Sequence, residues 1–137
     1  MTTIALVDDE NSIRTSVSLA LESEGFKVDV FQNGIEALEA LESKTYDLGL
    51  FDIKMPKMDG NELLAKVRSS KKDSLKEMPI IFLTSKDQEQ DEIIGLRMGA
   101  ADYITKPFSQ KLLNERIRTV LRVYQNRKAP TKYENEY

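Results

Sequence analysis

Hydrophobic residues are spaced along the chain in two different ways. Residues 2–7, 48–52 and 79–83 are short, nearly continuous hydrophobic runs, whereas residues 26–30 alternate and residues 102–105 form a last short run. Runs of this length, bounded by turn-forming residues, are typical of β-strands, and the continuous ones are typical of strands buried on both faces. The pattern therefore predicts five strands.

Between these strands, hydrophobic residues recur every three or four positions, as in amphipathic helices. Five helices are expected, which begin near Asn11, Asn33, Asp59 and Gln88 and after Phe108. The spacing places Ile35 on the inner face of the second helix and Leu112 on the inner face of the last one. Residues 69–78 are polar and rich in lysine, so they are expected to form an exposed connection.

Strands that alternate with helices predict a parallel sheet covered by helices on both faces. For five such units, right-handed connections favour the doubly wound, flavodoxin-like α/β fold with strand order 2-1-3-4-5, which places the first and third strands side by side. Residues 1–127 are expected to form this single domain. Residues 128–137 lose the hydrophobic periodicity, so they are expected to be a tail or the start of a linker.

The amino-acid composition excludes several kinds of chemistry for this chain. The chain has no cysteine and no histidine, which excludes thiol redox chemistry, thiolate zinc sites and an imidazole base or phosphate carrier within this sequence. No hydrophobic stretch is long enough for a membrane span. The first half is acidic and the second half basic, but the basic residues are scattered along helix faces, which favours a solvated surface over a nucleic-acid site.

The most distinctive side chains stand where the predicted strands end. The central run ends at Asp52, just before the turn-forming residues 54–60, and the first run ends at Asp8 and Asp9. Each could cap a turn or a helix if it stood alone. In the predicted topology, however, all three meet at the carboxyl edge of the sheet, where open α/β folds bind their ligands.

Three carboxylates in one crevice repel one another and stay ionised only beside a cation. Oxygen ligands with space left for water favour Mg²⁺ over Ca²⁺. Thr84 and Lys106, at the ends of the fourth and fifth strands, add a hydroxyl donor and a movable positive charge. This combination suits phosphoryl transfer, with Asp52 as a nucleophile that forms an acyl phosphate.

Several segments together carry a resemblance to a known family. They are Val7-Asp8-Asp9-Glu10, Asp52-Ile53-Lys54-Met55-Pro56 with Met58-Asp59-Gly60, Leu83-Thr84-Ser85, Gly99-Ala100 with Asp102-Tyr103-Ile104, and Thr105-Lys106-Pro107-Phe108. Over residues 2–125 the sequence resembles the receiver domain of bacterial two-component response regulators. Within that family it is most similar to the OmpR-like branch, whose receivers precede a winged-helix DNA-binding domain, and there to the ChvI regulator of alphaproteobacteria.

The resemblance implies a cytoplasmic, phospho-accepting switch that assists only its own phosphorylation and dephosphorylation and is not otherwise an enzyme. Asp52 would take the phosphoryl group from a phosphohistidine of a sensor histidine kinase, which suits a chain without histidine. Asp9, Asp52 and the backbone carbonyl of Lys54 would bind Mg²⁺ directly, and Asp8 would bind it through water.

The resemblance also implies a conformational response. Thr84 and Lys106 would bind phosphoryl oxygens, and Tyr103 would swing inward as Thr84 moves. The switch would control transcription through a C-terminal winged-helix DNA-binding domain that is absent from this chain, in which case the chain is a fragment of a regulator. The alternative is a stand-alone receiver that relays phosphate or binds a partner protein.

Receivers of the OmpR-like branch pair through the fourth helix, the last strand and the last helix. Asp102 and Arg116 are expected to form an ion pair across this interface, whereas Ala101 and Leu112 stand where acidic residues are common. The resemblance therefore implies a weak homodimer that forms on phosphorylation.

Two other protein classes share parts of this pattern. A phosphohydrolase of the haloacid dehalogenase type also uses an aspartate nucleophile with Mg²⁺, but it needs a carboxylate two residues later, where Lys54 stands. A flavodoxin-like FMN-binding protein shares the strand order, but Asp8, Asp9 and Glu10 would repel its phosphate. Both are disfavoured.

Overall fold

The computed structural model describes residues 1–85 and 87–128, and its centre is a five-stranded parallel sheet. The strands are β1 (Thr3–Val7), β2 (Lys27–Phe31), β3 (Leu48–Asp52), β4 (Ile80–Thr84) and β5 (Asp102–Thr105). Their order, β2-β1-β3-β4-β5, confirms the predicted topology. Val7 of β1 lies beside Phe51 of β3, so the residues that follow these two strands emerge at the same edge of the sheet.

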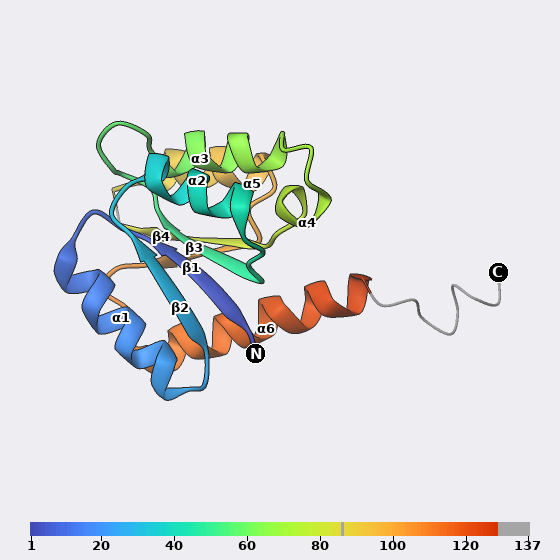
Figure 1. Cartoon of the computed structure of the whole chain (residues 1–137). Coiled ribbons are helices and arrows are strands. Elements are labelled where there is room, and N and C mark those ends of the chain that lie inside the picture. Colours follow the sequence, from blue (N-terminus) through green and yellow to red (C-terminus); the bar gives the residue numbers. More distant parts are fainter. Residues whose placement is uncertain (86, 129–137) are drawn as a thin grey trace.

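Helices cover both faces of the sheet, as predicted. They are α1 (Asn11–Ser23), α2 (Gly34–Ser43), α3 (Gly60–Arg68), α4 (Asp73–Lys76), α5 (Glu89–Arg97) and α6 (Gln110–Lys128). Helices α1 and α6 lie on one face, and α2, α3 and α5 lie on the other (Figure 1). No helix in the described part of the chain has the length and apolar character that a membrane crossing requires.

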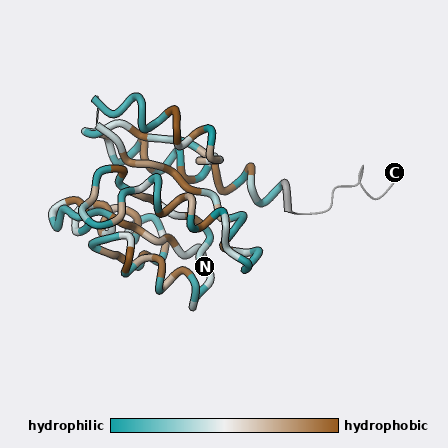
Figure 2. The backbone as a smooth tube through the Cα atoms, turned by 90° about the horizontal axis from the view of Figure 1, so that it is seen from above, coloured by the Kyte–Doolittle hydropathy of each residue, from teal (hydrophilic) through white to brown (hydrophobic). Residues whose placement is uncertain are grey.

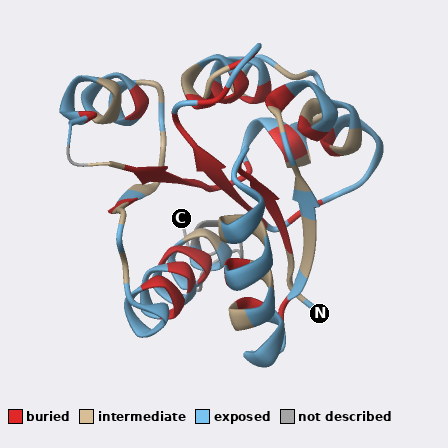
Figure 3. Ribbon diagram, turned by 90° about the vertical axis from the view of Figure 1, so that its left-hand side faces the viewer, coloured by how far each residue is buried: buried red, intermediate tan, exposed pale blue. Residues whose placement is uncertain are grey.

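The core consists of two hydrophobic layers, one on each face of the sheet. Strands β1, β3 and β4 are almost entirely buried (Figure 3), which explains their continuous hydrophobic runs. Phe51 and Leu63 belong to the layer under α2 and α3, whereas Leu50 and Ile117 belong to the layer under α1 and α6. Figure 2 shows hydrophilic and hydrophobic segments alternating along the helices, as expected when one side of each helix faces this core.

The structure corrects the prediction in three places. The stretch 69–78, expected to be an exposed connection, contains the one-turn helix α4, because Leu75 and Met78 are buried there. Ile35 and Leu112, expected to face inward, are 50% and 42% exposed. Helix α6 continues to Lys128, one residue into the predicted tail, and residues 129–137 lie outside the described residues.

The loop between β3 and α3 is packed closely against the end of β3. The amide of Gly60 donates a hydrogen bond to the Ile53 carbonyl at 2.7 Å, and the side chain of Asp59 caps α3 by accepting from the Glu62 amide at 2.8 Å. A Cβ atom on Gly60 would lie 2.5 Å from the backbone oxygen of Asp52. Glycine at this position therefore lets α3 begin directly beside the strand end that carries Asp52.

Gly60→Ala is expected to lower the free energy of unfolding by about 1–3 kcal/mol, because the new methyl group collides with backbone that cannot move freely. Gly34→Ala is the matched control, since Gly34 is also the first residue of a capped helix. There a Cβ would meet the flexible side chain of Met58 at 3.0 Å. Urea unfolding of both variants tests the idea, and equal losses of stability would contradict it.

Candidate functional site

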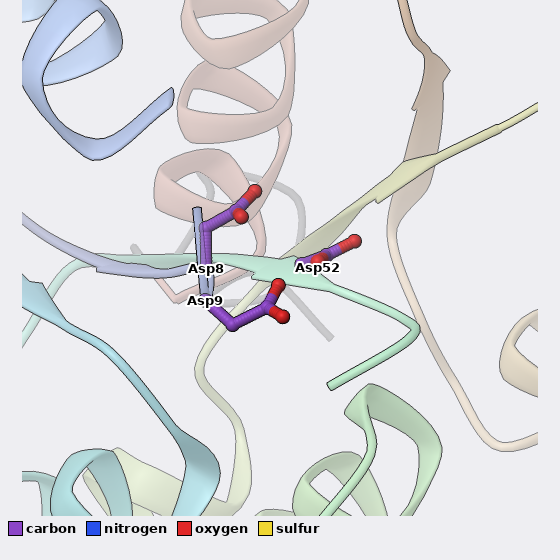
Figure 4. Close-up of side chains that lie close together, drawn as sticks. All are labelled: Asp8, Asp9 and Asp52. Atoms are coloured by element: carbon purple, nitrogen blue, oxygen red, sulfur yellow. The ribbon is translucent and has the colours of Figure 1, made fainter. Parts of the chain in front are cut away.

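Three carboxylates converge at the carboxyl edge of the sheet. Asp8 and Asp9 follow β1 and Asp52 is the last residue of β3, so the neighbouring strands bring the three side chains together (Figure 4). One carboxylate oxygen from each lies within 4.8 Å of the others. Asp8 and Asp52 are buried whereas Asp9 is exposed, so the cluster opens to solvent on one side. The sequence prediction of this cluster is confirmed.

Lys106 joins the cluster from the end of β5. Its Nζ lies 3.0 Å from Oδ2 of Asp8 and 3.4 Å from Oδ1 of Asp52. The other oxygen of Asp8 accepts a hydrogen bond from the Glu10 amide at 2.9 Å. The peptide bond between Lys106 and Pro107 is cis. Among the residues that the structure describes, a single ammonium group thus pairs with these two buried carboxylates, which leaves the pair short of positive charge.

The Asp52 carboxyl group binds its proton more tightly than an ordinary aspartate does. Burial, followed by the negative charge of Asp8, raises the pKa of Asp52 to about 7, against the opposing effect of Lys106. The pKa of Lys106 is also raised: burial acts to lower it, but the hydrogen bond to Asp8 and the charge of Asp52 outweigh that effect. Asp52 is therefore only partly ionised near neutral pH until a further cation approaches.

The donor set fits a small hard cation. Three carboxylate oxygens are clustered, two of their residues are buried, and the third is open to water, as Mg²⁺ sites that retain water ligands require. A hollow of about 200 Å³ adjoins them, lined by Asp9, Glu10, Asp52, Lys54, Ser85, Gln88 and Lys106. A larger hollow of about 370 Å³ lies between the end of α1 and α6, away from this cluster.

The structure does not present the hydroxyl of Thr84 to Asp52. Thr84 is fully buried at the end of β4, and its hydroxyl donates to Oε1 of Glu92 at 2.7 Å. The side chain of Tyr103 is 36% exposed on β5. The hydroxyl of Thr84 therefore faces Glu92 and not Asp52, and the inward swing of Tyr103 stays a prediction.

The predicted dimer residues lie together on the surface formed by β5 and α6. Nη1 of Arg116 lies 2.9 Å from Oδ2 and 3.1 Å from Oδ1 of Asp102 in the same chain. Leu112 lines the same shallow hollow as these two residues. The pair that was expected to form across a dimer is thus formed within one subunit in this structure.

Three residues that the sequence did not predict contact Thr84, Lys54 or Ser85 beside the carboxylate cluster. Glu92 holds the Thr84 hydroxyl, Asp91 pairs with Lys54 at 3.1 Å, and Gln88 accepts from the Ser85 amide at 2.8 Å. All three belong to α5 or the residue before it. The sequence holds no signal for these contacts, because they depend on how α5 is rotated against the sheet.

Comparisons with known proteins agree with the geometry. Residues 4–118 match the family described as the response regulator receiver domain. The chain is 42% identical over 119 residues to the alkaline phosphatase synthesis transcriptional regulatory protein PhoP of Bacillus subtilis, covering 87% of the chain and 48% of that protein. It is 38% identical over 122 residues to the regulatory protein VanRc of Enterococcus gallinarum, covering 89% and 51%.

Among solved structures, the CheY-like response regulator receiver domain protein of Methanospirillum hungatei superposes with a TM-score of 0.86 at 32% identity, covering 93% of this chain and 98% of that one. The chain spans about half the length of the curated relatives that it matches. None of these comparisons confirms the finer similarity to the ChvI regulator.

The raised pKa of Asp52 predicts a pH dependence in the metal-free protein. The folded state holds a proton on Asp52 that the unfolded state releases near its ordinary pKa of 3.8, so stability falls as pH rises from about 4 through about 7. Asp52→Asn cannot titrate there. Its stability advantage over the wild type should widen by roughly 2–3 kcal/mol between about pH 5 and about pH 8.

Urea unfolding of both proteins in EDTA measures this difference, and groups common to both cancel. Saturating Mg²⁺ should shrink the gap at about pH 8, because the cation stabilises the ionised wild-type carboxylate and has less to bind in the amide variant. A difference that is independent of pH would contradict the proposed environment of Asp52.

Proposed function

The chain belongs to the response regulator receiver domain family, and from that premise we propose that Asp52 accepts a phosphoryl group from a phosphohistidine of a sensor histidine kinase. The observation that carries the proposal is a buried carboxylate at a strand end that is flanked by two further carboxylates and by Lys106. Receiver domains are phospho-accepting switches, so the reaction sets a state of the protein and does not process a substrate.

The transfer is a displacement at phosphorus. An ionised Asp52 oxygen attacks the phosphorus, the P–N bond to the partner's imidazole breaks with its electron pair left on nitrogen, and a new P–O bond forms. The chain contains no histidine, so the donor must come from another molecule. The Nζ atom of Lys106 lies 3.4 Å from Oδ1 of Asp52, so this ammonium group can pair with a negatively charged oxygen of the phosphoryl group after the transfer.

Mg²⁺ is the proposed cofactor. Asp9, Asp52 and the Lys54 carbonyl would hold it directly and Asp8 through water, and when bound it supplies positive charge beside the phosphoryl oxygens. The same charge favours ionisation of Asp52, whose pKa of about 7 otherwise leaves much of the carboxyl protonated near neutral pH. The metal requirement thus follows from the charge balance of the site.

The proposed output is control of transcription in the cytoplasm through a winged-helix DNA-binding domain that would follow the receiver domain. Relatives named as transcriptional regulators support this proposal, and the chain covers about half of their length. Phosphorylation would act by favouring a homodimer through α5, β5 and α6. The exposed side chains of Ile93, Ile94 and Leu96 on α5 supply apolar area on that face.

We predict a Mg²⁺-dependent gain of one phosphoryl group when the protein is incubated with acetyl phosphate, measured as intact mass. Asp52→Asn should gain none, because the nucleophile is lost. Asp9→Ala should gain less at limiting Mg²⁺, because a metal ligand is lost. Asp59→Asn, which alters an acidic residue outside the cluster, is the control. An unchanged mass of the wild-type protein in the presence of acetyl phosphate and Mg²⁺ would contradict the proposal.

The dimer proposal predicts a charge-swap result. Arg116→Glu and Asp102→Arg should each weaken the dimer that wild type forms with beryllofluoride and Mg²⁺, because like charges would then face each other across the interface. An equimolar mixture of the two variants should dimerise again, since each chain offers the charge that the other lacks.

Analytical ultracentrifugation of each variant and of the mixture distinguishes this contact from the pair within one chain. Mixing cannot repair an intrachain pair. Dimerisation of Arg116→Glu at wild-type strength would place the interface elsewhere on the domain, and failure of the mixture to recover would restrict the pair to a role within one subunit.

A further inference from the structure

The hydroxyl of Thr84 is hydrogen-bonded to a side chain of helix α5. Thr84 is completely buried, and its Oγ1 donates to the carboxylate of Glu92 over 2.7 Å. The hollow beside Asp52 is lined from this side by Ser85 and Gln88, and Thr84 is not among its lining residues. The hydroxyl therefore points toward the helix and not toward the place where a phosphoryl group on Asp52 would lie.

A threonine hydroxyl has only one hydrogen to donate. It can serve the Glu92 carboxylate or a phosphoryl oxygen, but not both at once. Hydrogen bonds to an ionised carboxylate are stronger than those between neutral groups, and a buried hydroxyl that loses its acceptor is destabilised. The strength of this bond therefore enters the equilibrium between the resting and the phosphoryl-bound arrangements of Thr84.

We infer that Glu92 is a positioning residue that holds the Thr84 hydroxyl away from Asp52 in the resting protein, and that its release couples the site to α5. The inference rests on the proposed function. A second contact comes from the same turn of α5, where Asp91 pairs with Lys54, two residues after Asp52. The first half of α5 thus contacts both Thr84 at the end of β4 and Lys54, which lines the hollow, while exposed apolar side chains lie elsewhere on the same helix.

The direction of the effect follows from which state contains the bond. Removing the carboxylate destabilises only the arrangement in which Thr84 faces Glu92, so it shifts the population toward the arrangement in which the hydroxyl faces the site. A ligand that binds only that second arrangement then binds more tightly. Beryllofluoride with Mg²⁺ is such a ligand, because its beryllium bonds to an Asp52 carboxylate oxygen and its fluorine atoms then stand where phosphoryl oxygens would stand.

The test compares Glu92→Gln and Glu92→Ala with Glu89→Gln as the matched control. Glu89 and Glu92 both lie in the first turn of α5, so both glutamine variants remove one negative charge from the same helix end. Titration with beryllofluoride at fixed Mg²⁺, followed by NMR of the Thr84 and Tyr103 amides, should show binding tightened about 3- to 30-fold in Glu92→Gln and at least as much in Glu92→Ala. Glu89→Gln should remain within about twofold of wild type.

A second arm isolates the contact itself. In a Thr84→Val background, which lacks the hydroxyl, adding Glu92→Gln should leave the affinity unchanged, because the bond is already absent. Without ligand, the Thr84 amide signal of Glu92→Gln should move along the line that joins the free and bound wild-type positions. A purely structural role for Glu92 would not move that signal in this direction.

The outcomes distinguish failure of the positioning role of Glu92 from failure of the proposed function. If wild type binds beryllofluoride but Glu92→Gln binds it no more tightly, or if Glu89→Gln and the Thr84→Val background show the same gain, the positioning role is overturned and the proposed function stands. If wild type shows no Mg²⁺-dependent binding, the proposed function fails and the inference fails with it.

Discussion

The structure depends on a charge balance at the carboxyl edge of the sheet. Asp8 and Asp52 are buried there, and within residues 1–85 and 87–128 the one ammonium group that contacts both is that of Lys106. Burying charges without partners is costly, and removing the ammonium group would leave two buried carboxylates uncompensated, a change that costs about 3–5 kcal/mol in buried ion pairs. Burial, followed by the negative charge of Asp8, raises the pKa of Asp52 to about 7 despite the opposing effect of Lys106, so the ionised site favours a further cation. The proposals of metal binding and phosphoryl acceptance both rest on this shortage of positive charge.

The fold supplies that balance through the order of its strands. Because β1 and β3 are neighbours, Asp8, Asp9 and Asp52 emerge together, and the cores on both faces of the sheet keep these strand ends fixed. Gly60 allows α3 to begin close behind β3, while α5 approaches from the side of β4. Packed elements therefore surround the strand ends that carry the site, and α5 contacts Thr84 and Lys54 there through polar side chains.

The sequence was sufficient for the sheet order, the acidic cluster and the position of Lys106, because each depends on where a hydrophobic run ends. It was insufficient where the outcome depends on side-chain direction. The hydroxyl of Thr84 faces Glu92 on α5, and Leu112 on α6 is exposed. Both outcomes depend on how the helix is rotated about its own axis. The spacing of hydrophobic residues does not define that rotation to within one residue. Helix α4 was missed because two buried hydrophobic residues, Leu75 and Met78, are too few to produce a period.

The central claim is that Asp52 is a buried carboxylate whose ionisation is controlled by the cations around it. A carbon-13 NMR titration of its side-chain carboxyl group tests this claim most directly, with Asp52→Asn identifying the signal. The account predicts a pKa of about 7 without metal and a marked fall when Mg²⁺ is added to saturation. An ordinary pKa near 3.8 in the metal-free protein, or a titration that Mg²⁺ leaves in place, would contradict it.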